Sequence, residues 1–302
     1  MATTYNFVAA NKRRSILLVA LFVVIVGLVG WVVSQLLEAG PGGVFVALGF
    51  ATISSLVGYY NGDKIALATS GAQGPIQKSD QSYLYTMVEN LCITSGQPMP
   101  KVFVISDPNI NAFATGRDPQ HASIAVTTGA IEKLANEELE GVLAHELSHV
   151  KNYDIRFMTL VLVLVGTLSL LSDFFVRSTL WGGGRRRESN GGGNVLAVVG
   201  IVLLILAPII GALIQLAVSR KREFLADASG ALLTRYPEGL ASALEKIAVT
   251  TTRPMARAST ATAHLFFSNP FGPGSGGLSK LFATHPPVEE RVKALRAMGG
   301  LQ

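Results

Sequence analysis

The sequence of 302 residues is poor in cysteine and in charge. Cys92 is its single cysteine, which excludes an internal disulfide and a cysteine-based zinc finger or iron–sulfur site. Charged residues make up 15% of the chain, against about a quarter in typical soluble domains. Apolar residues reach 49%, which excludes intrinsic disorder for most of the chain. The net charge of +5 forms no basic stripe of the kind that binds nucleic acid.

The apolar residues are concentrated in four blocks. Two lie near the N-terminus, at 16–37 and 40–62, and two lie further along, at 157–172 and 195–219. About 20 apolar residues are enough to cross the hydrocarbon core of a bilayer. We therefore predict membrane helices here, and we expect the third to end at Asp173.

Basic residues precede the first block. These are Lys12, Arg13 and Arg14, whereas the loop at 38–43 contains neither Lys nor Arg. The positive-inside rule then places the N-terminus in the cytoplasm. The apolar run is too long for a signal peptide and no small-residue cleavage pattern follows it, so we expect a retained anchor.

The chain divides into four predicted parts. Residues 1–62 form an anchor of two helices, 63–156 the first part of a soluble domain, 157–219 an apolar hairpin, and 220–302 the second part of the domain. The hairpin either crosses the membrane twice or packs beside it, and both arrangements leave the soluble parts on one side. Its loop, 182–194, is rich in glycine and arginine, which predicts a flexible connection.

Local patterns in the soluble parts predict short strands between helices. β-Branched residues mark the strands and apolar residues at helical spacing mark the helices. The expected strands are 101–105, 111–116 and 122–127, and the expected helices include 82–93 and 288–298. Asn136 is predicted to cap a further helix, which carries two glutamates in its first turn. The expected fold is a helical membrane anchor joined to a mostly α domain with a small β-sheet.

The helix after Asn136 contains the sequence His145-Glu146-Leu147-Ser148-His149. Two histidines four residues apart share one helix face, so both imidazoles can reach one tetrahedral zinc ion. The glutamate beside the first histidine is placed to take a proton from a zinc-activated water. This spacing is typical of the zincins. The alternative is that both histidines belong to an ordinary helix.

A catalytic zinc ion needs a third protein ligand and one open position. Glu223 has the best context, because it follows the fourth apolar block and Asp227 shares its helix face. One of these two is predicted to bind the metal and the other to accept the Nδ1 proton of a ligand histidine. Asp154 is expected to be structural or to orient a histidine. The other candidates downstream are His264 and His285.

A second cluster of polar residues lies near the C-terminus. His285 precedes two prolines, and Arg291 lies on the helix that follows. A histidine and an arginine there can donate hydrogen bonds to a developing oxyanion. A turn followed by an exposed helix is the alternative.

Together these segments resemble the HtpX-type integral-membrane zinc metallopeptidases, relatives of the CAAX prenyl protease. The resemblance covers nearly the whole chain. It is carried by the sequence HELSHVKNYD from His145 to Asp154, by the anchor and the apolar hairpin, and by segments 111–116, 223–227 and 284–291. It implies an α+β zincin domain of the gluzincin-like kind and one zinc ion per subunit.

The resemblance also implies a role for each candidate residue. It implies that the zinc ligands are His145, His149 and Glu223, and that Glu146 is the general base. It implies that Asp227 orients a ligand, and that His285 and Arg291 line the cleft with His285 as a transition-state donor. It implies an edge strand that holds the substrate main chain by strand addition, formed by Asn111, Ala112, Phe113, Ala114, Thr115 and Gly116.

The function implied is that of a membrane endopeptidase in protein quality control and the stress response. Its substrates are expected to be misfolded or damaged membrane proteins, cut at the cytoplasmic face of the bacterial inner membrane. Expected partners are polypeptide substrates and the lipid bilayer, and no nucleic acid. Two alternatives are a prenyl-protein processing protease and a membrane scaffold that binds metal without proteolysis.

Overall fold

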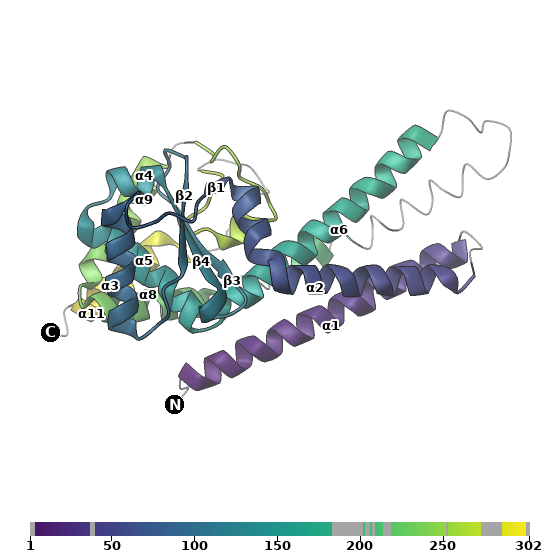
Figure 1. The fold of residues 1–302 in the computed structure, drawn as a ribbon, viewed down its shortest axis with the longest axis horizontal. Coiled ribbons are helices and arrows are strands. Elements are labelled where there is room, and N and C mark those ends of the chain that lie inside the picture. Colours follow the sequence, from purple (N-terminus) through teal and green to yellow (C-terminus); the bar gives the residue numbers. More distant parts are fainter. Residues whose placement is uncertain are drawn as a thin grey trace.

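The structure is a computed structural model that describes residues 4–36, 40–182, 209–213, 219–251, 253–272 and 286–299, together with residues 202 and 206. Long helices extend from a rounded body of shorter helices and a small sheet (Figure 1). The N-terminal end of the first helix lies beside this body, and the other end points away from it.

Three long helices form the extended part, and their bounds are α1 Thr4–Leu36, α2 Gly42–Ser70 and α6 Asp154–Gly182. Within the described residues, three stretches are long and apolar enough to cross a membrane, namely Val8–Gln35, Gly42–Ser70 and Asp154–Asp173. The first three predicted blocks are therefore confirmed as helices, and each helix is longer than its block.

Small residues allow the long helices to pack closely. On α2, a Cβ atom added to Gly62 would lie 2.5 Å from Cγ2 of Thr159, and one added to Gly58 would lie 3.0 Å from Cγ1 of Val163. These two glycines lie one helical turn apart and face α6. Small residues at this spacing are typical of helix pairs within membranes.

The membrane-capable stretch of the third block ends at Asp173, as predicted, but the helix does not end there. Helix α6 passes through Asp173 and continues to Gly182, because an exposed carboxylate on the helix surface does not interrupt the backbone hydrogen bonds. The predicted fourth block, 195–219, lies outside the described residues apart from 202, 206, 209–213 and 219. The glycine- and arginine-rich loop, 182–194, lies outside them after its first residue.

The sheet has four strands in the order β1-β2-β4-β3. Their bounds are β1 Ala72–Gln73, β2 Lys101–Ile105, β3 Ala112–Gly116 and β4 Ala122–Thr127. Strands β2 and β4 are parallel, whereas β1 and β3 pair antiparallel with their neighbours. The three predicted strands are confirmed, although β3 begins one residue later than expected. Strand β3 forms one edge of the sheet.

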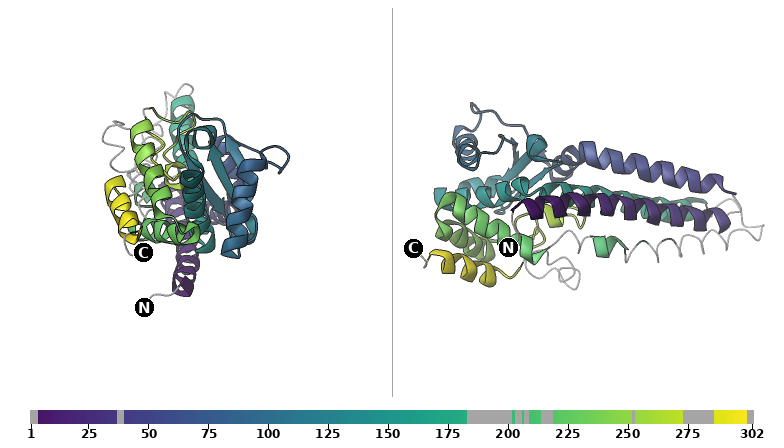
Figure 2. Two further views of the ribbon diagram at one scale, coloured as in Figure 1. Left: turned by 90° about the vertical axis from the view of Figure 1, so that its left-hand side faces the viewer. Right: turned by 90° about the horizontal axis from the view of Figure 1, so that it is seen from below.

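Helices surround this sheet, and α5 is the central one (Figure 2). It contacts β3 as well as α8 and α9, and its residues Leu139, Leu143 and Leu147 are fully buried. The helices of the body are α3 Ser82–Ser95, α4 Thr128–Lys133, α5 Asn136–Lys151, α8 Arg220–Thr234, α9 Pro237–Thr250 and α11 Val288–Gly299, with short 3₁₀ turns η1 Pro119–His121 and η2 Ala263–Leu265.

The start of α5 differs from the prediction by one residue. Ala135 holds the N-cap position, and its backbone N–H donates to the Glu138 carboxylate at 2.7 Å. Asn136 instead accepts a hydrogen bond from the Tyr83 hydroxyl at 2.6 Å. Glu138 thus satisfies the backbone N–H of the N-cap residue, and Asn136 lies at the first helical position rather than at the cap.

Candidate metal centre

Two histidines of α5 face one another across one helical turn. Their Nε2 atoms are 3.1 Å apart, and their side chains are 1% exposed at His145 and 5% exposed at His149. His145 Nδ1 lies 2.9 Å from Oδ1 of Asp227, and His149 Nδ1 lies 3.2 Å from Oδ2 of Asp154. Because an ionised carboxylate only accepts, each Nδ1 carries the proton. The two Nε2 atoms face one another and are the ring positions that a bound cation would occupy.

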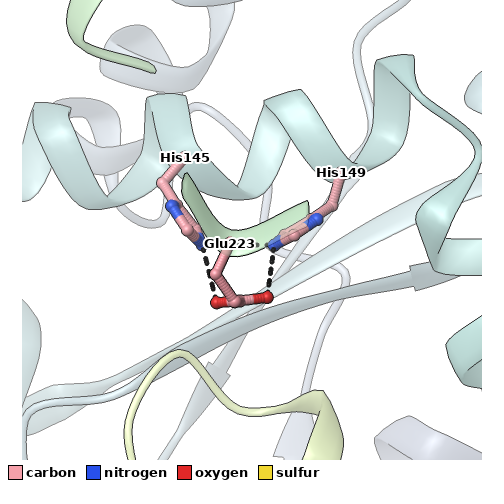
Figure 3. Close-up of side chains that lie close together, drawn as sticks. All are labelled: His145, His149 and Glu223. Atoms are coloured by element: carbon pink, nitrogen blue, oxygen red, sulfur yellow. Dashed lines mark hydrogen bonds and ion pairs between the residues drawn. The ribbon is translucent and has the colours of Figure 1, made fainter. Parts of the chain in front are cut away.

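Helix α8 places a carboxylate opposite these two nitrogens (Figure 3). Oε2 of Glu223 lies 3.8 Å from Nε2 of His145, and Oε1 lies 3.7 Å from Nε2 of His149. One ligand atom from each residue lies within 4.8 Å of the others, and all three residues are buried. Within the described ranges, no other three His, Cys, Asp or Glu side chains meet in this way.

The arrangement fits a zinc ion. Tetrahedral bonds of about 2.0–2.1 Å place neighbouring ligand atoms about 3.3 Å apart, close to the observed separations of 3.1, 3.7 and 3.8 Å. Two unprotonated ring nitrogens at 3.1 Å repel each other unless a cation or a proton lies between them. The donor set of two imidazoles and one carboxylate is that of catalytic zinc sites.

The two histidines show opposite pKa shifts. Burial lowers the pKa of His145 to about 4. Burial has the same effect on His149, but the carboxylates of Asp154, Glu223 and Glu146 outweigh it and raise the pKa to about 9. The cluster of carboxylates therefore attracts one positive charge to the space between the rings.

Glu146 follows the first histidine on α5 and is buried, with 1% of its surface exposed. Its carboxylate is among the groups that raise the pKa values of His149 and Arg291. The residue predicted to act as the general base is therefore close to the paired imidazoles.

Asp227 is held by a buried arginine. Nε and Nη2 of Arg291 donate to the two carboxylate oxygens of Asp227 at 2.8 and 2.6 Å. Burial alone raises the pKa of Asp227, but the hydrogen bonds from Arg291 and His145 lower it to about 2. Asp227 is thus ionised and keeps the Nδ1 proton of His145 in place. Arg291 was expected to line the cleft, yet it is 1% exposed and reaches the centre through Asp227.

Gly230 determines how closely α8 approaches α5. It lies on the same face of α8 as Glu223 and Asp227, seven and three residues after them. A Cβ atom at this position would lie 2.9 Å from the backbone nitrogen of His145. Since backbone atoms cannot easily move aside, only glycine permits this contact.

The predicted substrate strand corresponds to β3, and part of its free edge is used by the chain itself. The backbone N–H of Phe267 donates to the carbonyl of Ala112 at 2.8 Å. The Asn111 side chain exchanges two hydrogen bonds with the backbone of Ser268, at 3.0 and 3.1 Å. The ring of Phe267 also packs edge-on against His145, with centroids 4.9 Å apart.

Two other candidate residues lie apart from the centre or outside the described chain. His264 Nε2 lies 2.9 Å from the backbone carbonyl oxygen of Met158 and is not part of the group that meets at the metal centre. His285, predicted as a transition-state donor, lies outside the described residues. Asp154 contacts His149, one of the two placements expected for it.

Sequence reasoning missed three residues near the centre: Asn11, Gly230 and Phe267. Gly230 had a signal, because it continues the helix face of Glu223 and Asp227. Asn11 had none, because it precedes Lys12, Arg13 and Arg14, where a polar residue is ordinary. Phe267 had none, because an aromatic residue in a loop is not distinctive.

Comparisons with known proteins agree with this geometry. The sequence profile of peptidase family M48 matches residues 78–299. A protein described as "Protease HtpX homolog" from Caldanaerobacter subterraneus subsp. tengcongensis is 46% identical over 98% of both chains. One of the same description from Lactobacillus acidophilus is 45% identical over 97% of this chain and 99% of its own. The crystal structure of S. mikatae Ste24p matches the fold with a TM-score of 0.52 and 19% identity, over 95% of this chain and 66% of that one. The chain belongs to peptidase family M48 and is a membrane metalloprotease of the HtpX type.

Proposed function

We propose that the chain is a zinc-dependent endopeptidase that cleaves misfolded or damaged membrane proteins at the cytoplasmic face of the bacterial inner membrane. The observation that carries this proposal is the convergence of His145, His149 and Glu223 beside Glu146. Two histidines on one helix and a glutamate on a second helix match the ligand pattern of a gluzincin-like zincin.

The proposed reaction assigns a separate task to each side chain. A zinc ion bound by the three ligands supplies a Lewis acid, which polarises the scissile carbonyl and lowers the pKa of a water molecule. Glu146 accepts a proton from the attacking water and passes it to the leaving amine. Asp227 and Asp154 hold the two imidazoles so that Nε2 of each faces the ligand position.

The proposed orientation rests on where α1 begins. Its N-terminal end lies beside the body, since the side chain of Asn11 donates to the backbone carbonyl of Asn152 at 2.9 Å. Lys12, Arg13 and Arg14 lie at this same end. By the positive-inside rule, basic residues flanking a membrane helix remain in the cytoplasm. This supports a multi-pass chain whose catalytic body faces the cytoplasm.

The proposed catalytic body combines the two soluble parts, 63–156 and 220–302. Helix α5 from the first part packs against α8 and α9 from the second. Each part contributes ligands to the same centre, so both lie on one side of the membrane. This supports an even number of crossings between them, with α6 leading away from the body and the chain returning before α8.

The proposed substrate site uses the outer edge of β3. Main-chain groups that face away from β4 are already hydrogen-bonded at both ends of the strand. The carbonyl of Ala112 accepts from the backbone N–H of Phe267, and the N–H of Gly116 donates to the hydroxyl of Thr159. Ala114 lies between them and faces the same way, because alternate strand residues share a side. We assign the main-chain groups of Ala114 to a substrate peptide, bound by strand addition.

The test is a pair of substitutions on α5. Glu146→Gln removes the proposed base and is expected to abolish proteolysis of an unfolded membrane protein while about one zinc ion per chain is retained. Glu137→Gln is the matched control, because Glu137 is exposed in the first turn of the same helix. Wild-type digestion by Glu146→Gln overturns the mechanism.

The same purified protein separates the two alternative functions. We expect the wild type to digest a misfolded membrane protein and to leave a prenylated peptide uncut. Cleavage of the prenylated peptide alone would assign the chain to prenyl-protein processing. Zinc binding without cleavage of either substrate would assign it to a metal-binding scaffold.

A further inference from the structure

The junction between α5 and α6 orients one histidine of the metal centre. Helix α5 ends at Lys151 and α6 begins at Asp154. Between them, Tyr153 has a φ of 60°, a left-handed conformation that is uncommon for a residue with a bulky side chain. The resulting sharp turn brings Oδ2 of Asp154 to 3.2 Å from Nδ1 of His149.

The first membrane helix holds this junction through a buried asparagine. Nδ2 of Asn11 donates to Oδ1 of Asp154 at 2.7 Å and to the backbone carbonyl of Asn152 at 2.9 Å. Asn11 is 2% exposed. Both hydrogens of its carboxamide are therefore directed at the two residues on either side of Tyr153.

A neighbouring residue of α1 contacts the middle of the junction. The ammonium of Lys12 lies 4.3 Å from the ring centroid of Tyr153. The guanidinium of Arg156, on α6, lies 5.1 Å from the same ring. Two cations on one aromatic ring stabilise its position. Successive residues of α1 thus contact all three residues of the turn.

Arg222 on α8 also approaches Oδ1 of Asp154, with its Nε atom at 3.6 Å, so the 2.7 Å hydrogen bond from Asn11 is the shorter of these contacts. A buried asparagine in an apolar helix carries a desolvation cost unless it is hydrogen-bonded.

We infer that Asn11 is a positioning residue of the metal centre, which fixes the ring of His149 by holding Asp154. The first membrane helix is then part of the catalytic apparatus as well as an anchor. This inference rests on the proposed function of the site, since it assigns His149 as a zinc ligand.

The experiment uses the full-length chain with Asn11→Leu. Leucine has nearly the same size and suits a membrane helix, but it donates no hydrogen bond. Ser15→Ala is the matched control, because Ser15 is buried one turn further along α1 and its hydroxyl bonds only the carbonyl of residue 11. Zinc affinity is measured by competition with a chelator, and the site geometry by the visible spectrum of the cobalt-substituted protein.

Asn11→Leu is expected to raise the zinc dissociation constant about tenfold and to change the cobalt spectrum. At saturating zinc it is expected to lower kcat with KM unchanged, because Asn11 does not reach the substrate. Ser15→Ala is expected to match the wild type in all four measurements. The zinc-free Asn11→Leu chain is expected to melt at a lower temperature than the other two proteins, because the carboxylate of Asp154 and the carbonyl of Asn152 lose a buried donor.

A double-mutant cycle tests whether Asn11 acts through Asp154. In an Asp154→Asn background, Asn11→Leu is expected to weaken zinc binding no further. An equal additional loss in that background would overturn the inference, as would wild-type zinc affinity of Asn11→Leu. An unchanged cobalt spectrum of Asn11→Leu would also overturn it, because Asn11 would then support the fold without orienting His149. A wild-type chain that neither binds zinc nor cleaves defeats the proposed function instead.

Discussion

At the scale of single side chains, carboxylates surround the paired imidazoles in two ways. Asp227 and Asp154 bind the outer nitrogens, and Glu223 faces the inner ones. The first two fix the orientation of the rings, whereas the third completes the group of ligand atoms. Substitutions at these positions are therefore expected to have different effects.

Glu223→Gln is expected to remove most bound zinc. The amide keeps the size of the side chain but loses the negative charge that the metal requires. Zinc content, measured after dialysis against a weak chelator, should fall from about one ion per chain to near zero, with proteolysis lost in parallel. Glu132→Gln is the control, since Glu132 is exposed on α4. Full zinc and full activity in Glu223→Gln would show that another residue is the third ligand.

Arg291→Leu is expected to destabilise the fold as well as the metal centre. It leaves the carboxylate of Asp227 buried without its bidentate partner, which typically costs about 3–5 kcal/mol. Arg291→Lys restores the charge but not the planar pair of donors, so its cost should be smaller. Chemical unfolding and zinc affinity measure both effects. Normal stability with a raised KM would instead place Arg291 against the substrate, as the sequence suggested.

The sequence predicted the part of the site that lies on single helices. His145, Glu146 and His149 follow from one helical spacing, and Glu223 with Asp227 from another. The spacing did not show which partner each residue would find, because partners come from elements distant in the chain. Arg291 illustrates this, since its place beside Asp227 depends on how α11 packs against α8.

At the scale of elements, the N-terminal end of α5 is joined to α9 through Glu138. Its carboxylate accepts hydrogen bonds from the Ser242 hydroxyl at 2.7 Å, from the ammonium of Lys246 and from the backbone of Ala135. The helix that carries both histidines is thereby fixed to a neighbour at the end opposite the metal centre.

Glu138 gives α5 a pH-dependent stability. Burial alone would raise its pKa. The hydrogen bonds from Lys246, Ser242 and Ala135 have the opposite and larger effect, so the pKa of Glu138 is below the usual 4.5. Stabilisation from this group is therefore complete above pH 4.5 and is lost as the pH falls below it. Glu138→Gln should lose about 1.5–3 kcal/mol at neutral pH and less at about pH 4. Denaturant unfolding of the wild type and of Glu138→Gln at both pH values gives the difference in their free energies of unfolding. A difference of the same size at neutral pH and at about pH 4 would contradict the prediction.

Elements were predicted more reliably than their ends. Alternating and β-branched residues identified the strands, since those patterns reflect local burial. The start of α5 was predicted one residue too late, and the apolar pattern did not show that α6 continues beyond Asp173, because side chains decide helix ends case by case. The close contact of α8 with α5 at Gly230 was also not predicted, because it depends on the backbone of His145.

At the scale of the whole molecule, the body lies at one end of the long helices (Figure 1). The body is on the same side as the N-terminal end of α1, and the C-terminal end of α1 and the start of α2 are at the far end. The first three apolar blocks indicated the membrane-capable helices of the described residues, but not that the body would contact α1 directly.

Single cysteines test the orientation of this arrangement. In a Cys92→Ala background, Ser79→Cys places a thiol on the exposed surface of the body, and Gly42→Cys places one at the exposed start of α2. We expect a membrane-impermeant maleimide to label position 42 in spheroplasts and position 79 only in inverted vesicles. The opposite pattern would place the body outside the cytoplasm.

The ligand set is divided along the chain, with both histidines before α6 and Glu223 after it. A ribosome therefore delivers α5 well before α8, and an unfinished chain holds two imidazoles without the acidic partner. We expect such a nascent chain to bind metal weakly and to lack peptidase activity, because the proposed third ligand has not yet been made. The proposed protease would then be inactive during its own insertion into the bilayer, and neither its emerging segments nor the insertion machinery beside it would be exposed to cleavage.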